Sequence, residues 1–386
     1  MNQEFQAKIS NLSNEKKILL SKLLAEKGLE QNKINLEGTK ADKTTLNYYQ
    51  RSIFFLNQYN DNDLIYNLTG AILIHEFIDA KRFQLIFQKL IERHEILRTG
   101  FTTTDGKPVQ FIREHVPFTL GYTEVAGRME YEGKKIIDDR IEEIRHYRFD
   151  LSAPPLLKAH LVKFENGEGA LIINLHHLIA DAWSVYLLLK ELQLIHDSIV
   201  SGNNDVLPKL VSQYTDYTNW LNGMMQTVIF KKKLEYWKTQ LAGAPALFSL
   251  PTDFARPAVK NFSGSSFSIW LGNDRLVSLK QFAKEREVSL FMVLLTAFKI
   301  VLSRYTAQND IVIGTPVANR VFPGSQDLIG LFINMVAIRS AVNDEMTVSD
   351  LLEKIKETTI NAYNNQDVPF EKIVESLGVK RDTSCL

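Results

Sequence analysis

Two adjacent histidines followed by an aspartate are the residues of this sequence that best fit acid–base chemistry. His176 and His177 lie in the segment NLHHLIADAWS, and Asp181 follows four residues after the second histidine. Histidine is the side chain most often used to take up and release a proton during catalysis. The spacing alone is not specific, because His75 also has an aspartate four residues later, as does His146. The case for a functional site therefore rests on the doubled histidine, on Ser184 and on the surrounding elements.

Metal binding is the first alternative reading of this segment. His176, His177 and Asp181 are chemically suitable ligands. Adjacent residues of a strand point to opposite faces, however, so both imidazoles cannot easily reach one ion. We therefore expect no metal site, with one histidine supporting the backbone and the other entering a cavity.

The elements around the histidines place them at a strand-to-helix junction. Residues 156–164 and 170–177 are two β-rich runs joined by the turn signal ENGEG. Apolar residues then recur at helical spacing from Val185 to Ile195. Before these runs, the pattern predicts a helix over 79–93 and a hairpin over 101–112.

A second series of elements follows from about residue 230. It comprises a helix over 231–241, a strand over 267–271, a helix over 289–305 and a strand over 310–317. The chain thus consists of two successive α/β units, which we place at residues 41–220 and 221–386. Residues 1–40 are expected to form an amphipathic helix over 13–28 and a polar linker, with a possible docking role.

Composition limits the classes of partner. Lysine plus arginine and aspartate plus glutamate number 45 each among 386 residues, which argues against a nucleic-acid-binding surface. The single Cys385 excludes a disulfide within the chain. We find neither a signal peptide nor an apolar run of membrane-helix length. We therefore expect a cytoplasmic protein with no membrane partner.

Several motifs resemble, in order, those of the condensation domains of non-ribosomal peptide synthetases. The segment LHHLIADAWS corresponds to the His-His-x-x-x-Asp-Gly core of that family. The resemblance runs from Leu46 to Ser384 and includes LNYYQRSIFFL, RHEILRTGF, YTDYTNW, IGTPVANR, LIGLFINMV, NQDVPFEKIVE and RDTS.

The resemblance implies an α/β (α+β) fold of two chloramphenicol-acetyltransferase-like lobes, arranged as a V-shaped pseudodimer. It also implies a second lobe that is incomplete at its C-terminus, because RDTSCL stops before the pattern ends. The implied reaction joins a donor acyl or peptidyl thioester to the α-amine of an acceptor aminoacyl thioester. Upstream donor and downstream acceptor carrier proteins would present both substrates on 4'-phosphopantetheine. The domain itself would bind no cofactor, would be monomeric, and would precede an adenylation domain.

Roles for individual residues also follow from the resemblance. His177 is expected to hold the amine and relay its proton, whereas His176 supports folding. Asp181 is expected to cross-link the chain through Arg320, with Arg98 as a second anchor. Further candidates for active-site support are Arg93, Ser184 and Ala182, which replaces the usual glycine, and candidates for lining the substrate tunnel are Trp183, Tyr49 and Asn334.

Two other functions stay open. A stand-alone acyl-thioester transferase would acylate a diffusible amine or alcohol, and a catalytically weak domain would serve only as a carrier-binding scaffold. The segment DAWS is closer to condensation domains that accept an L-configured donor than to those that follow an epimerisation step.

Overall fold

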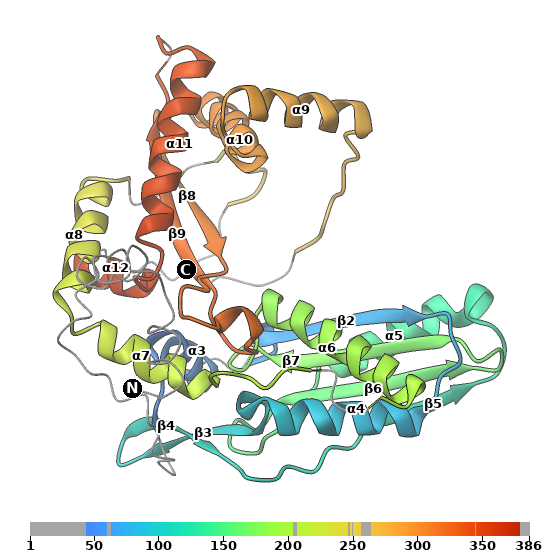
Figure 1. Cartoon of the computed structure of the whole chain (residues 1–386). Coiled ribbons are helices and arrows are strands. Elements are labelled where there is room, and N and C mark those ends of the chain that lie inside the picture. The colour runs from blue at the N-terminus through green and yellow to red at the C-terminus, as the bar shows by residue number, and fades with distance from the viewer. Residues whose placement is uncertain are drawn as a thin grey trace, which may run out of the picture. The chain divides into compact units, whose positions relative to one another are not determined.

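The computed structural model describes residues 44–59, 63–203, 207–245, 248, 250–255, 264–343 and 345–378. The expected helix over 13–28, its linker, Cys385 and the RDTS motif lie outside these residues. The chain divides into two compact units (Figure 1). Unit 1 contains the chain up to Ile229 together with the segment Arg320–Phe332, which we call the crossover segment. Unit 2 contains Phe230–Asn319 and the chain from Ile333 onward.

Unit 1 is built on a four-stranded sheet with the order β2-β7-β6-β5. Strand β5 is parallel to β6, and the other neighbours are antiparallel. All eight residues of β7 are buried. A strand buried on both faces needs cover on both faces. Figure 1 shows α5 behind this sheet and α4 and α6 in front of it. The four strands are β2 (Asn67–Ile74), β5 (Gly121–Val125), β6 (Leu157–Phe164) and β7 (Gly169–His176).

Two of the helices that cover the four-stranded sheet, α4 and α6, lie where the sequence predicts helices. Helix α4 (Ala80–Arg93) starts after Asp79, whose carboxylate accepts the backbone N–H groups of Lys81 and Arg82. Helix α6 (Ala182–Ser201) has Asp181 as its N-cap and ends at Gly202 in the left-handed conformation, with φ 70°. Helix α5 (Lys134–Arg145) covers the other face of the sheet through Ile137. The predicted helix over 79–93 is confirmed.

A second, three-stranded sheet of unit 1 has the order β1-β4-β3. The predicted hairpin is confirmed: Asp105 and Gly106 have φ values of 51° and 73°, as a two-residue hairpin turn requires. The remaining elements of this unit are β1 (Thr44–Thr45), β3 (Thr99–Thr104), β4 (Lys107–Ile112), α3 (Tyr48–Tyr59), α7 (Tyr214–Met224), η1 (Asp63–Tyr66), η2 (Glu95–Arg98), η3 (Met129–Gly133) and η4 (Ser325–Asp327).

Unit 2 combines a two-stranded antiparallel sheet with helices. Strand β8 (Asp310–Val317) pairs with β9 (Asn334–Ala341), and α10 and α11 pack against these strands. The crossover segment connects the two strands along the chain. The helices are α8 (Val228–Leu241), α9 (Asn273–Glu285), α10 (Leu290–Thr306), α11 (Val348–Asn364) and α12 (Phe370–Leu377).

A buried lysine ties α10 to this small sheet. Lys299 is fully buried and donates to the backbone oxygens of Ile311 and Ile338 and to Ser340 Oγ, at 3.2, 2.7 and 3.0 Å. Burial lowers the pKa of Lys299 to about 7. The three acceptors offset the cost of removing the ammonium group from water. Helical periodicity alone would have assigned this position to an apolar residue.

The predicted strand over residues 267–271 is wrong. These residues form no strand, and the side chains of Phe267 and Trp270 are 89% and 87% exposed. β-rich residues form a strand only when another strand supplies hydrogen bonds, and no partner strand lies beside them in the described residues. Local composition therefore overestimated the extent of the sheet.

None of the helices among the described residues has by itself the length and apolar composition of a membrane span. Helices α9 and α10 reach that length and composition only as a pair, which is bent by 102°.

Candidate active site

His176 and His177 lie where β7 ends, as the sequence predicts. His176 is the last residue of β7 and pairs with Asn67 of β2. The backbone N–H of His177 donates to the oxygen of Tyr66 at 2.8 Å, which holds the chain as it leaves the sheet. The histidines therefore have fixed backbones but different surroundings.

His176 lies inside the protein, with 2% exposure. Its ring centroid lies 6.2 Å from that of Tyr66 and 6.0 Å from that of Phe149, and its Nδ1 accepts the Leu178 N–H at 3.2 Å. Burial, with a smaller effect from His177, lowers the pKa of His176 to about 3. A neutral imidazole that accepts a backbone N–H supports the loop and does not exchange protons at neutral pH.

His177 has a half-buried imidazole that forms no hydrogen bond with any described residue. Its Nδ1 is enclosed without a partner. An imidazole with unpaired nitrogens can accept or donate a proton when a substrate group arrives. Among the described residues, no three His, Cys, Asp or Glu side chains form a group that could hold a metal ion.

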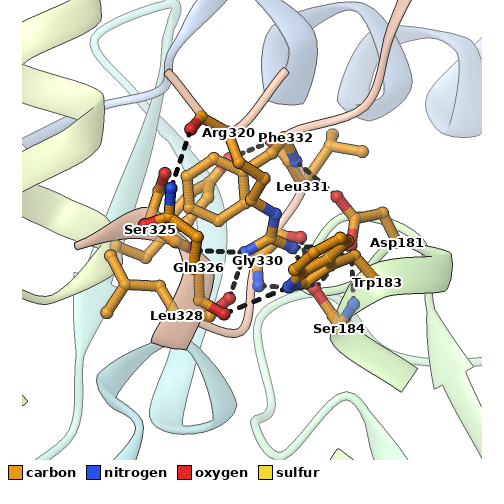
Figure 2. A network of polar contacts seen from close by, with 11 residues as sticks. Asp181, Trp183, Ser184, Arg320, Ser325, Gln326, Leu328, Gly330, Leu331 and Phe332 are labelled. Atoms are coloured by element: carbon orange, nitrogen blue, oxygen red, sulfur yellow. Dashed lines mark hydrogen bonds and ion pairs between the residues drawn. The ribbon is translucent and has the colours of Figure 1, made fainter. Parts of the chain in front are cut away.

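Asp181 is 1% exposed, and its carboxylate receives donors from the first turn of α6 and from the crossover segment (Figure 2). Oδ1 accepts Ser184 N–H at 2.8 Å, Ser184 Oγ–H at 2.7 Å and the Arg320 guanidinium at 2.8 Å. Oδ2 accepts the backbone N–H of Phe332 at 3.0 Å. Each donor satisfies a lone pair of a buried charge. This carboxylate is therefore engaged in structural bonds.

Arg320 extends this cluster into the crossover segment. One terminal nitrogen donates to Asp181 and Ser184 Oγ, and the other donates to the backbone oxygens of Ser325 and Leu328. The Phe332 ring centroid lies 3.9 Å from the guanidinium carbon. Burial lowers the pKa of Arg320, and the neighbouring Asp181 opposes that shift. The expected Asp181–Arg320 pair is present and folds the crossover segment around the guanidinium.

Ser184 and Gly330 form a reciprocal contact at the first turn of α6. Ser184 Oγ accepts the Gly330 N–H at 3.0 Å, and its single proton is shared between Asp181 Oδ1 at 2.7 Å and the Gly330 oxygen at 2.8 Å. The Tyr214 ring packs so closely that a Cβ at Gly330 would lie 2.0 Å from a ring carbon. Tyr214 also donates to the Leu331 oxygen at 2.6 Å and accepts from Asn47 at 2.9 Å. Glycine is required here for space.

The prediction that Arg98 is a second anchor of Asp181 is wrong. Its guanidinium donates to the backbone oxygens of Ile91, Arg113 and Glu114. The short η2 turn aims the side chain back at the end of α4 and the end of β4. Arg98 therefore ties the end of α4 to the chain that follows β4.

Arg93, a candidate for active-site support, lies in a buried cluster with His94 and Glu191. Both Arg93 and His94 bind the buried Glu191 of α6, at 3.2 and 2.7 Å. Burial alone would raise the pKa of Glu191, but the bonds and charges of His94 and Arg93 lower it below its usual value. Arg93 thus fixes α4 to α6. No sequence pattern predicts the contact between His94 and Glu191, because its only local sign is a single glutamate within the apolar stripe of α6.

The remaining candidates differ in surroundings. Tyr49 is 5% exposed and Asn334 is 5% exposed, so neither lines an open surface. The Asn334 amide donates to the oxygens of Gln366 and Val368 and accepts the Phe370 N–H, which fixes the start of α12. Trp183 is 40% exposed and stays a binding candidate. Ala182 is exposed at the first position of α6, where helical φ values suit alanine as well as glycine.

Comparison with known proteins identifies the family. The model of the Condensation domain family matches residues 40–385. The chain belongs to the condensation-domain family. Condensation domains of non-ribosomal peptide synthetases are acyltransferases that form peptide bonds.

This condensation domain is 38% identical over 340 residues to a linear gramicidin synthase of Brevibacillus parabrevis, and the match covers 88% of the chain. It is 35% identical over 365 residues to gramicidin S synthase 2 of Brevibacillus brevis, and that match covers 95% of the chain. The chain spans only 4% and 8% of the lengths of these two relatives. Both relatives are therefore much longer polypeptides.

Two solved structures show the fold. The X-domain from teicoplanin biosynthesis matches 90% of this condensation domain and 77% of its own chain, with a TM-score of 0.78 and 23% identity. The first condensation domain of the calcium-dependent antibiotic synthetase matches 88% and 79%, with a TM-score of 0.76 and 18% identity. The similarity to these structures confirms the expected mixed α/β fold of two chloramphenicol-acetyltransferase-like lobes.

Proposed function

We propose that this chain forms an amide bond between two carrier-bound substrates. A donor acyl or peptidyl thioester is attacked by the α-amine of an acceptor aminoacyl thioester, and both are held on phosphopantetheine arms of carrier proteins. Membership of the condensation-domain family and similarity to peptide synthetases support this reaction. An upstream donor carrier, a downstream acceptor carrier and a following adenylation domain are the partners that we propose, in a cytoplasmic setting.

The observation that carries the proposal is the unpaired imidazole of His177, four residues before a fully engaged Asp181. The α-amine of an aminoacyl group has a pKa of about 8, so a good part of it is free base at neutral pH. The amine nitrogen bonds to the thioester carbonyl carbon, and the C–S bond breaks as the tetrahedral intermediate collapses. His177 accepts the proton that the amine loses and returns it to the departing thiolate.

Replacement of His177 by alanine tests this function. With both carriers loaded, we expect amide formation to fall by roughly 10²- to 10⁴-fold, the usual contribution of a positioned acid–base group. His115→Ala removes an exposed histidine and serves as the matched control. An unchanged rate in the His177→Ala protein would remove His177 from the chemistry.

The acceptor decides between this function and its nearest alternative. We expect product on the acceptor carrier and little product when a free amino acid or a free alcohol replaces the aminoacyl carrier. Efficient acylation of the free amine or alcohol would instead identify a stand-alone acyl-thioester transferase. D- and L-configured donors, compared in the same assay, test the expected preference for the L donor.

A further inference from the structure

The exposed face of helix α6 carries two aromatic residues one turn apart. Trp183 is 40% exposed and Tyr186 is 62% exposed, and their rings meet edge to face with centroids 6.4 Å apart. The opposite face of α6, with Leu187 and Leu188, is buried. Large aromatic rings that stay in contact with solvent while packing on each other are available to a ligand. We call this pair, Trp183 and Tyr186, the aromatic ledge.

The Trp183 half of the aromatic ledge is held in one orientation. Its indole N–H donates to the backbone oxygen of Gln326 at 3.1 Å, and the Arg320 guanidinium lies 5.8 Å from its ring (Figure 2). All three residues belong to unit 1. A ring fixed in this way loses little conformational freedom when it contacts a ligand, so the contact retains more of its free energy.

The aromatic ledge lies close to the loop that carries His177. Side chains of an α-helix lean toward its N-terminus, so both rings cover the first turn of α6. The Cα of Tyr186 lies only about 6 Å along the axis from that of Ala182, the first residue of the helix. His177 precedes this first turn by five residues. Only the four residues 178–181 separate His177 from the helix that carries both rings.

We propose that the aromatic ledge binds the apolar side chain of a carrier-bound aminoacyl group and that Tyr186 is a specificity-determining residue. The inference rests on the proposed function, because it assumes a thioester substrate at His177. An aromatic contact contributes about 0.5–1.5 kcal/mol beyond the burial of its area, which corresponds to about 2- to 10-fold in affinity. A phenylalanyl group should gain this contact, whereas an alanyl group is too short.

Binding of non-hydrolysable analogues to the full chain tests the aromatic ledge. Phenylalanyl- and alanyl-aminopantetheine mimic the acceptor, and their N-acetyl derivatives, whose amine is blocked, mimic the donor. Isothermal titration calorimetry should show about 2- to 10-fold tighter binding of the phenylalanyl compound in at least one of these two pairs. The pair that shows the preference tells which substrate the ledge contacts.

Three substitutions distinguish a direct contact with the Tyr186 ring from a general disturbance of the structure. Tyr186→Ala should abolish the phenylalanyl preference, and Tyr186→Phe should keep it. Tyr122→Ala, which removes a 42% exposed ring from β5, should also leave the preference intact. A full preference in Tyr186→Ala, or equal or absent binding of both compounds by the parent protein, would overturn the inference.

His177→Ala distinguishes failure of the inference from failure of the proposed function. This variant should bind the phenylalanyl compound with the parent preference while amide formation is lost. A phenylalanyl preference in a protein that forms no amide with loaded carriers would leave the ledge in place and refute the proposed reaction. Amide formation by a protein that binds the phenylalanyl and alanyl compounds equally would support the proposed reaction and refute the aromatic ledge.

Discussion

The guanidinium of Arg320 donates to the carboxylate of Asp181 at 2.8 Å, although the two residues are 139 positions apart in the chain. Their side chains are 5% and 1% exposed. The aspartate of the His-His-x-x-x-Asp motif therefore caps α6 and at the same time holds the crossover segment, through Arg320 and the Phe332 N–H. This explains how a motif residue can be required without touching a substrate.

Replacement of Asp181 by alanine should destabilise the protein as well as lower its activity. Removing one partner leaves the Arg320 charge buried without compensation, which costs about 3–5 kcal/mol. Urea unfolding measures this loss. Asp197→Ala, at the exposed far end of α6, should change the free energy of unfolding by less than about 1 kcal/mol. An Asp181→Ala protein that is as stable as its parent but inactive would show a direct chemical role.

Gly330→Ala tests the close approach of Tyr214 to the crossover segment. The added Cβ would lie 2.0 Å from a Tyr214 ring carbon, so the ring must move and weaken its bond to the Leu331 oxygen. We expect a loss of about 1–3 kcal/mol in unfolding experiments. Gly223→Ala, where the space is open, is the matched control. Equal stability of the two variants would contradict this close packing.

His176 should make stability depend on pH. Its pKa is about 3 in the folded protein and about 6.5 in the unfolded chain, so between these two pH values the unfolded state binds more protons. Stability is therefore fully present above pH ~6.5 and falls by about 2 kcal/mol from pH 7 to pH 5. His176→Asn should lose this component of the pH dependence. The parent and the variant, compared by urea unfolding at both pH values, should differ in slope; parallel slopes would exclude His176 as its source.

Glu191→Gln should loosen the contact between α4 and α6. The substitution removes the negative charge that compensates Arg93 and contacts His94 inside unit 1. We expect a loss of at least about 3 kcal/mol in the free energy of unfolding. Because the pKa of Glu191 is lowered, its contribution is present at neutral pH and is lost as the pH falls through the folded-state value. Glu143→Gln, which removes one partner of an exposed ion pair on α5, should leave the free energy of unfolding almost unchanged. An equal loss of stability in the two variants would contradict the role of Glu191 in fixing α4 to α6.

Local chemistry was enough to predict the setting of the candidate site. Two β-rich runs joined by a turn signal predicted β6 and β7. Helical periodicity predicted α4 and α6, because burial of one helix face fixes the spacing of apolar residues. The two histidines could therefore be placed at the end of β7. Adjacent residues of a strand point to opposite faces, which predicted different surroundings for His176 and His177.

Only the tertiary structure decided which charged groups meet. The pairing of Asp181 with Arg320 was expected from family resemblance, whereas the Phe332 N–H, the His94–Glu191 bond and the aim of Arg98 depend on backbone directions that no local pattern encodes. The exposed residues 267–271 failed as a strand for the same reason, since a strand needs a partner that its own residues cannot provide. Periodicity records burial within one element, but hydrogen bonds and ion pairs depend on how elements distant in sequence pack together.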